Sequence, residues 1–455
     1  MIYGQVRLHL VKKGAETRRR SHTRQPRQKA GRFNVNIKGR KWPVVVIVCV
    51  TVFAALLFIA QDPRTLHVRS RVAATDPDFP DYIAALIDVP VTHGDAFDVL
   101  RNGDEFYASM LAAVKEARKR ILFETYNYNK GEAGELFTNA LAEAAKRGVD
   151  VRLVLDAFGA SSPPPNLDAR IESVGGKVLW FNQVRLRSIE SQNTRTHRKL
   201  LVVDGEIAFT GGAGVADHWL GHAQDPDHWR DTQFKITGPA VRLLEACFYE
   251  NWLEAGGEGA PDLQHRAGDG PGNSSTLVVW SNPVGGVSNV KQLYLYSIAS
   301  ARHTIDIQSP YFVPDASALA ALYEARARGV RVRILSDGDV TDAKSVKHAT
   351  RHTYQRLLDA GMEVYEYQPT MMHAKIMTVD GVWSVVGSGN FDNRSLELND
   401  EITVAVFDPD LGRRVKTHFE ADLAKSKHWL SEDWKKRPWH WKVREFLWGI
   451  LGEVF

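Results

Sequence analysis

The feature that most constrains this chain is a short motif that occurs twice. In each copy a histidine lies two residues before a lysine and seven before an aspartate; the copies are His197-Lys199-Asp204 and His373-Lys375-Asp380. A spacing of two places the histidine and the lysine on the same face of a strand. Two imidazoles and two ammonium groups brought together suit a phosphodiester, because they supply a nucleophile, a proton donor and positive charge. The repeat therefore predicts one phosphodiester site built from two similar halves.

The duplication extends into the segments around the motifs. Residues 117–126 are similar to 301–311, and residues 145–156 are similar to 325–337. The second pair has the pattern of a helix end, a glycine stop and an alternating β-branched strand. This alternation of helices and strands predicts an α/β fold. We expect two tandem α/β sandwich domains packed as a pseudo-dimer, so that one site receives a histidine from each.

Composition along the chain predicts six segments. They are a basic disordered tail at 1–41, a transmembrane helix at 42–61, a first catalytic domain at 72–255, a Gly- and Pro-rich linker at 256–275, a second catalytic domain at 276–430, and a Trp-rich segment at 431–455. The expected helices of the first domain include 104–118 and 135–147, and its motif strand is 199–203. In the second domain the expected strands are 276–280, 304–308, 330–335 and 375–379.

The membrane helix is predicted from an uncharged, apolar run. No residue from Trp42 to Gln61 is charged, and about 20 such residues cross a bilayer as a helix. A buried core helix and a cleaved signal peptide are the alternatives. The polar tail before the run disfavours the first, and Phe58, at a position where cleavage needs a small residue, disfavours the second. The basic tail carries Glu16 as its one acid; this asymmetry retains it in the cytoplasm and places the catalytic domains outside.

The motif side chains suggest a two-step displacement without a cofactor. A neutral imidazole attacks phosphorus to give a phosphohistidine, while the opposite imidazolium protonates the leaving alkoxide and later deprotonates the acceptor. Lys199 and Lys375 hold the negative charge of the non-bridging oxygens. These groups already counter the phosphate, so no metal ion and no other cofactor is expected.

The carboxylates of the two halves are expected to support the histidines. Asp204 and Asp380 complete the motifs but lie in Val-Asp-Gly turns, so we expect them to stabilise the structure behind the lysines rather than to react. Each imidazole needs another carboxylate to orient it. Asp231 and Glu401 occupy corresponding positions near strand starts. We expect Asp231 to serve the first half-site and Glu401 the second.

The two motifs resemble the HxKxxxxD motifs of the phospholipase D superfamily, over about residues 90–430. The segments at 236–241, 307–315 and 387–395, with Asn399 and Glu401, resemble its bacterial cardiolipin synthase branch. The resemblance implies that His197 attacks and His373 acts as the acid, with Ser388 and Asn390 near the phosphate. The first half departs from the family pattern, because Gly212-Ala213-Gly214 replaces Ser-x-Asn. Backbone N–H groups of that turn are the expected substitutes.

The resemblance also implies a substrate and a location. The implied reaction moves a phosphatidyl group from one phosphatidylglycerol to another and releases glycerol, so the expected partners are anionic phospholipids, namely phosphatidylglycerol and cardiolipin. The implied location is the bacterial inner membrane. Hydrolysis of phospholipids by water is the alternative. A nucleic-acid phosphodiesterase is less favoured, because the net charge of +4 comes from the tail and leaves the catalytic body slightly acidic. A scaffold with a dead site would have lost a motif residue, and neither copy has.

Two further clusters stand outside the motifs. His218, His222 and His228 have a spacing that can suit a metal on a helix, but Gly221 and Pro226 favour a loop at the rim of the site. The C-terminal segment combines tryptophans with cations. For this segment we favour contact with a bilayer surface over packing on the second domain.

Overall fold

The computed structural model describes residues 65–182, 195–259, 270–281 and 288–450. The predicted tail at 1–41 and the predicted transmembrane helix at 42–61 lie outside these residues. Among the described residues, no helix is both long enough and apolar enough to span a membrane. We refer to residues 65–259 as the first half and to residues 270–450 as the second half.

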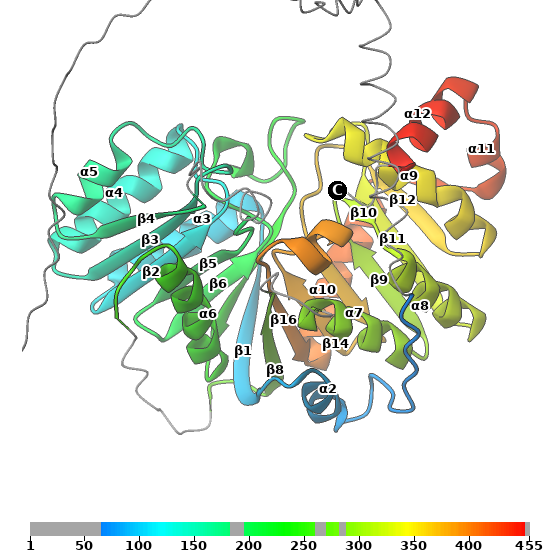
Figure 1. Cartoon of the computed structure of the whole chain (residues 1–455), viewed down its shortest axis with the longest axis horizontal. Helices are drawn as coiled ribbons and strands as arrows, with labels where there is room; N and C mark the ends of the chain where they lie inside the picture. Colours follow the sequence, from blue (N-terminus) through cyan, green and yellow to red (C-terminus); the bar gives the residue numbers. More distant parts are fainter. Residues whose placement is uncertain (1–64, 183–194, 260–269, 282–287, 451–455) are drawn as a thin grey trace, which may run out of the picture. The chain divides into compact units, whose positions relative to one another are not determined.

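One sheet of 15 strands runs through both halves (Figure 1). The first half contributes seven strands in the order β1-β7-β6-β5-β2-β3-β4. Their bounds are β1 Val91–Arg101, β2 Arg120–Thr125, β3 Asp150–Asp156, β4 Lys177–Phe181, β5 Lys199–Val203, β6 Ile207–Gly211 and β7 Thr232–Thr237. The predicted motif strand at 199–203 is thus confirmed as β5.

The second half repeats this order outward from the junction. It runs β8-β16-β14-β13-β9-β11-β12, and β17 is added at its outer edge. The bounds are β8 Ser274–Trp280, β9 Thr304–Gln308, β11 Arg331–Asp337, β12 Glu363–Tyr367, β13 Ile376–Val379, β14 Trp383–Gly387, β16 Ile402–Phe407 and β17 Ser426–Trp429. A separate two-stranded ladder pairs β10 Phe312–Val313 with β15 Phe391–Asp392. The predicted α/β class is confirmed.

The halves meet where β1 pairs with β8. The pairing is antiparallel, with Val91 opposite Leu277, and its register shifts between His93 and Asp95. Because both strands are interior members of the sheet, the junction leaves neither with an open edge. The motif strands β5 and β13 stand in matching places on either side of this junction.

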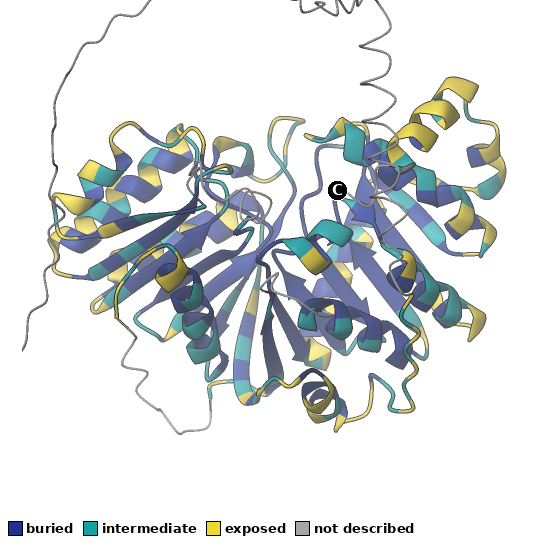
Figure 2. Cartoon of the chain, viewed as in Figure 1, coloured by how far each residue is buried: buried dark blue, intermediate teal, exposed yellow. Residues whose placement is uncertain are grey.

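Helices cover both faces of the sheet (Figures 1 and 2). The first half carries α3 Asn102–Glu116, α4 Glu132–Lys146, α5 Leu167–Glu172 and α6 Ala240–Glu254. The second carries α7 Asn289–Ser300, α8 Ala316–Ala327, α9 Lys344–Asp359, α10 Pro409–Leu423, α11 Ser431–Lys435 and α12 Trp439–Ile450, while α2 Phe79–Ile87 precedes β1. Most strands are buried, whereas the outer faces of the helices reach solvent.

One hydrophobic core is shared by the two halves. It lies beneath α6 and α10 and joins first-half side chains such as Phe97 and Phe248 to second-half side chains such as Val278 and Phe419. Two further cores flank the shared one. One lies within the first half beneath α3, α4 and α5, and the other joins α2 of the first half to α7, α8 and α9 of the second. Burial of apolar surface in the shared core stabilises the junction that the site requires.

Candidate active site

Each motif histidine is bonded through its backbone to the opposite half. The N–H of His197 donates to the carbonyl of Asp400 at 2.9 Å, and the N–H of His373 donates to the carbonyl of Arg230 at 2.7 Å. The neighbouring residues form two isolated parallel bridges, Thr196 with Asp400 and Arg230 with Met372. The two histidines, far apart in sequence, are therefore both held at the junction of the halves.

The orienting carboxylates also cross between the halves. Nδ1 of His197 lies 2.8 Å from Oε1 of Glu401, and Nδ1 of His373 lies 3.0 Å from Oδ2 of Asp231. Both carboxylates are fully buried. The predicted pairing, with Asp231 behind His197 and Glu401 behind His373, is therefore wrong. The cause is the backbone pairing above, which places the strand start of each half beside the histidine of the other.

The two carboxylates are supported by different donors. Glu401 accepts a hydrogen bond from the Ser388 hydroxyl at 2.5 Å, through its Oε2 atom. Asp231 has no such serine, because Gly212 stands at the equivalent position. Instead, Nε1 of Trp219 donates to Oδ2 of Asp231 at 3.0 Å. Trp219 is a site residue that the sequence analysis missed; the missing serine was the signal that another donor had to replace it.

Gly212 is required by the close approach of the opposite half. A Cβ atom at this position would collide with the Asp231 carboxylate and with the carbonyl oxygen of His373. The Gly-rich turn therefore makes room for the contact between Asp231 and His373, which a larger residue at position 212 would displace. Ser388, predicted near the phosphate, is fully buried behind Glu401 and serves as its donor. The side-chain oxygen of Asn390 is buried and has no hydrogen-bond partner within the described residues.

The motif lysines lie beside their own histidines. Nζ of Lys199 donates to the carbonyl of His197 at 2.9 Å, and Nζ of Lys375 donates to the carbonyl of His373 at 2.6 Å. Both lysines are buried. Burial is the main reason that the pKa of Lys199 falls to about 7 and that of Lys375 to about 8, and repulsion between the two ammonium groups lowers the pKa of Lys199 further. The site thus concentrates positive charge that an anion would relieve.

The histidines are neutral at neutral pH in the absence of an anion. Burial, followed by repulsion from the motif lysines, lowers the pKa of His197 to about 4 and that of His373 to about 3, although the carboxylates act against this. Their partners remain ionised, since contacts with His197 and Lys199 outweigh burial and lower the pKa of Glu401 to about 2. The pKa of Asp231 is also lowered, through its bonds to His373. Each carboxylate therefore accepts Nδ1–H, which leaves the lone pair of the neutral imidazole on Nε2.

Aromatic rings surround both imidazoles. Tyr126 stands edge-on to His197, with ring centroids 5.1 Å apart. Trp219 and Trp229 each lie 5.4 Å from His373. These rings restrict the rotation of the imidazoles and exclude water from their sides.

The motif aspartates lie at the far ends of the motif strands from the lysines. Asp204 accepts hydrogen bonds from the backbone N–H groups of Arg118, Lys119 and Arg120. Asp380 does the same for Arg302, His303 and Thr304. The expected contact behind the lysines is wrong, because each strand carries its aspartate away from the site. Each carboxylate instead secures the loop that leads into the adjacent strand, β2 or β9.

The three histidines at 218–228 have separate partners. His218 stacks on Trp229 with centroids 3.7 Å apart. His222 lies 3.4 Å from Asp104, and His228 lies 2.7 Å from Asp225. In the described part of the chain, no group of three or more His, Cys, Asp or Glu side chains is arranged to hold a metal ion. His218 belongs to the aromatic wall of the His373 half-site.

Comparison with known proteins gives a consistent result. A family model described as "Cardiolipin synthase, PLD-like domain" matches residues 110–225 and 294–423. The chain is 33% identical to cardiolipin synthase 2 of Bacillus cereus over 359 residues, which is 78% of this chain and 70% of the relative. It is 32% identical to the major cardiolipin synthase of Bacillus subtilis over 367 residues, or 80% of this chain and 76% of the relative.

A solved structure shares the fold. The phosphatidylserine synthase of Haemophilus influenzae superposes with a TM-score of 0.65 and covers 83% of this chain and all of its own. Their sequence identity is 15%, so this similarity concerns the fold alone.

Proposed function

Because the chain belongs to the phospholipase D-like family of cardiolipin synthases, we propose that it is a phosphatidyltransferase that makes cardiolipin from two molecules of phosphatidylglycerol. The observation that carries the proposal is the crossed pair of carboxylate–histidine contacts at the junction of the halves. Such a pair supplies two oriented imidazoles to one phosphorus atom. The two halves act as a pseudo-dimer around this single site.

The first step forms a phosphohistidine. Nε2 of His197 attacks the phosphorus of phosphatidylglycerol, and the bond from phosphorus to the glycerol oxygen breaks. His373 gives its proton to that oxygen, and glycerol leaves. Lys199 and Lys375 hold the non-bridging oxygens through the transition state.

The second step reverses the proton transfer. A free hydroxyl of a second phosphatidylglycerol gives its proton to His373 while its oxygen attacks phosphorus. The bond between phosphorus and His197 breaks, which yields cardiolipin and the neutral imidazole. Water in place of the lipid hydroxyl would give phosphatidic acid, so exclusion of water favours transfer over hydrolysis.

Substrate binding prepares His373 to act as an acid. Without an anion, burial and then repulsion from the two lysines keep this imidazole neutral. The negative phosphodiester counters the lysines and raises the pKa of the imidazole. Asp231 stabilises the imidazolium that forms, in the manner of a carboxylate behind a catalytic histidine. The Nδ2–H group of Asn390 is the donor that we assign to the phosphate, because its Oδ1, which has no partner within the described residues, can only accept a hydrogen bond.

A membrane location suits lipid substrates for donor and acceptor. The uncharged run at 42–61 anchors the chain once in a bacterial inner membrane, with the catalytic halves outside the cytoplasm. The C-terminal segment does pack on the second half, since α12 lies against α9 with Arg351 over the Trp441 ring. The remaining side of α12 is an exposed apolar surface, formed by Trp439, Val443, Phe446, Leu447 and Trp448. Figure 2 shows this helix as one of the exposed elements. Aromatic and apolar side chains beside cations are typical of a helix that lies at the bilayer interface.

The deciding experiment supplies purified full-length protein with phosphatidylglycerol vesicles and measures products by lipid mass spectrometry. Cardiolipin and glycerol in equal amounts are the expected products. The variants His197→Ala and His373→Ala should each lose activity by at least about a thousandfold. His303→Ala, a change of an exposed histidine in the same half as His373, is the matched control and should keep wild-type activity.

The possible failures separate the alternatives. Phosphatidic acid as the main product would replace transfer by hydrolysis. Turnover in either histidine variant close to that of the control would overturn the two-histidine mechanism.

A further inference from the structure

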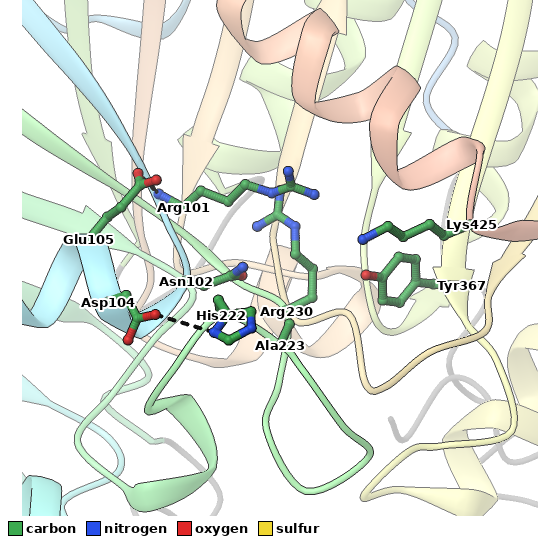
Figure 3. A pocket seen from close by; sticks show the side chains of 9 residues that line it. All are labelled: Arg101, Asn102, Asp104, Glu105, His222, Ala223, Arg230, Tyr367 and Lys425. Carbon is green, nitrogen blue, oxygen red and sulfur yellow. Dashed lines mark hydrogen bonds and ion pairs between the residues drawn. The ribbon is translucent and has the colours of Figure 1, made fainter.

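A second polar cavity lies beside the His373 half-site, at the junction of the halves (Figure 3). Its volume is about 340 Å³. The first half contributes residues from β1, α3 and the loops before β7, and the second contributes the ends of β12 and α10. The lining residues are Arg101, Asn102, Asp104, Glu105, His222, Ala223, Arg230, Tyr367 and Lys425.

Cations outnumber acids on one wall of this cavity. Nη2 of Arg101 lies 2.7 Å from Oδ1 of Asp422, and Nη2 of Arg230 lies 2.9 Å from Oδ2 of the same carboxylate. The single buried carboxylate of Asp422 thus forms ion pairs with two guanidinium groups. The Lys425 side chain extends toward Arg230 from the other side (Figure 3). Three cations and one acid leave this wall with an excess of two positive charges.

The acids on the opposite wall are engaged with other groups. Asp104 pairs with His222. The Glu105 carboxylate accepts the backbone N–H of Arg101 at 2.7 Å. Asp104 and Glu105 balance the formal charge of the cavity as a whole. Neither acid forms an ion pair with Lys425 or Arg230 in the described structure, so the positive excess is confined to the cationic wall.

Arg230 and Tyr367 are held in place before any ligand arrives. Arg230 is fully buried, and its Nη1 donates to the carbonyl of Asp231 and, at 2.8 Å, to the hydroxyl of Thr232. Tyr367 is 1% exposed and turns its hydroxyl toward the Lys425 ammonium (Figure 3). A rigid cluster of donors loses little entropy when it binds a small anion.

We propose that this cavity is a binding site for a small phosphate-bearing ligand, separate from the phosphate position between the two histidines. Arg101, Arg230 and Lys425 would hold the phosphate oxygens, with the Tyr367 hydroxyl as a further donor. Free phosphate and the phosphate of a lipid headgroup share this chemistry. The ligand would contact Arg230, which directly precedes Asp231 in the chain. Asp231 is the carboxylate that orients His373.

The test is calorimetric titration of the full-length protein with inorganic phosphate. We expect two binding events, one at the histidines and one in the cavity. Lys425→Glu should weaken one event at least tenfold and leave the other unchanged. Lys416→Glu is the matched control, because Lys416 is an exposed lysine of α10 that does not line the cavity. Because Lys425 is also exposed, its replacement does not disturb a packed core.

The result that overturns the proposal is equal binding of phosphate by the Lys425→Glu and Lys416→Glu proteins. A second arm identifies the source of the ligand. Vesicles of phosphatidylcholine with phosphatidylglycerol should displace phosphate from the Lys425-dependent event if the ligand is a headgroup, and vesicles of phosphatidylcholine alone should not. Failure of both vesicles to displace it assigns the site to free phosphate. Binding is measured without turnover, so this test is independent of the proposed reaction.

Discussion

Trp219 and Ser388 perform one task in two chemically different ways. Each donates to the carboxylate that orients a histidine, Trp219 to Asp231 and Ser388 to Glu401. An indole N–H donates and does not accept, whereas a hydroxyl does both. Ser388 also receives the backbone N–H of Ile402 at 3.0 Å. The His373 half-site is therefore held by a bulky ring and the His197 half-site by a compact hydrogen-bond network.

Trp219→Phe should lower kcat about tenfold with little change in KM. The substitution retains a ring beside His373 but removes the donor to Asp231, and a hydrogen bond to a charged group contributes roughly 1.5–3 kcal/mol. Steady-state assays on phosphatidylglycerol vesicles measure the effect. Trp229→Phe is the control, because Trp229 lies beside the same histidine and forms no hydrogen bond to Asp231 in the described structure. Equal loss in both variants would assign the effect to packing.

The lysines predict an alkaline limit to activity. Lys199 and Lys375 have pKa values of about 7 and about 8 in the absence of an anion. Their charge is present below these values and is lost as pH rises through them, so kcat/KM should fall above about pH 7–8. A bound phosphodiester raises both pKa values, so the fall in kcat should occur at higher pH. Coincident falls in the two profiles would contradict this account.

At the residue scale, the sequence predicts which residue types meet but not every partner. The matched motifs indicated two histidines, two lysines and two orienting carboxylates. Asp231 and Glu401 occupy similar sequence positions in their halves. Nothing in these positions shows which histidine each carboxylate contacts. That choice depends on the backbone pairing of Asp400 with Thr196 and of Arg230 with Met372, which is a contact of distant segments.

At the element scale, the two Val-Asp-Gly turns stabilise the ends of the motif strands. The backbone at Asp204 and Asp380 is left-handed, with φ of 55° and 52°. Aspartate tolerates this conformation better than most residues. Each turn lets one carboxylate collect three N–H groups from the loop before the neighbouring strand. The motif strands β5 and β13 are thereby fixed against β2 and β9 at their ends remote from the histidines.

Asp380→Ala should destabilise the fold more than it affects catalysis. It leaves three N–H groups without their acceptor and places alanine in a left-handed conformation. We expect the free energy of unfolding to fall by about 2–4 kcal/mol. Urea unfolding gives this value, and kcat of the folded enzyme at low temperature should stay within about twofold of wild type. Asp410→Ala, which removes an exposed ion pair, should cost about 1 kcal/mol or less. A large loss of kcat in folded Asp380→Ala would mean a direct catalytic role.

The secondary structure follows from local signals, and the order of the strands does not. Glycine stops and β-branched runs predicted strands such as Thr304–Gln308, which is β9. The antiparallel junction of β1 with β8 joins segments separated by the whole first half. Its register is not set by a turn between the strands, because they are far apart in the sequence.

At the scale of the whole molecule, the halves are parts of one catalytic unit. The sheet is continuous through the junction, and the core beneath α6 and α10 draws side chains from both halves. Each half carries the histidine that the other half orients. We therefore expect that neither half alone would be active.

A complementation experiment tests this dependence. Equimolar mixtures of the His197→Ala and His373→Ala proteins should remain as inactive as either variant alone, because every chain then lacks one imidazole in its own site. Wild-type protein diluted with either variant is the control and should show activity in proportion to its share. Restoration of activity in the mixture would indicate that chains exchange halves, and would contradict a site formed within one chain.

The covalent connection between the halves has a consequence for symmetry. A dimer of identical chains must present the same surroundings to both of its histidines. In a single chain that spans both halves, each position can differ from its counterpart. Gly212 differs from Ser388, and Asp231 receives an indole N–H from Trp219 where Glu401 receives a serine hydroxyl. Joining the two halves in one chain thus removes the requirement for twofold symmetry. The two imidazoles can then take different roles. One can become the better leaving group from phosphorus while the other becomes the better proton carrier.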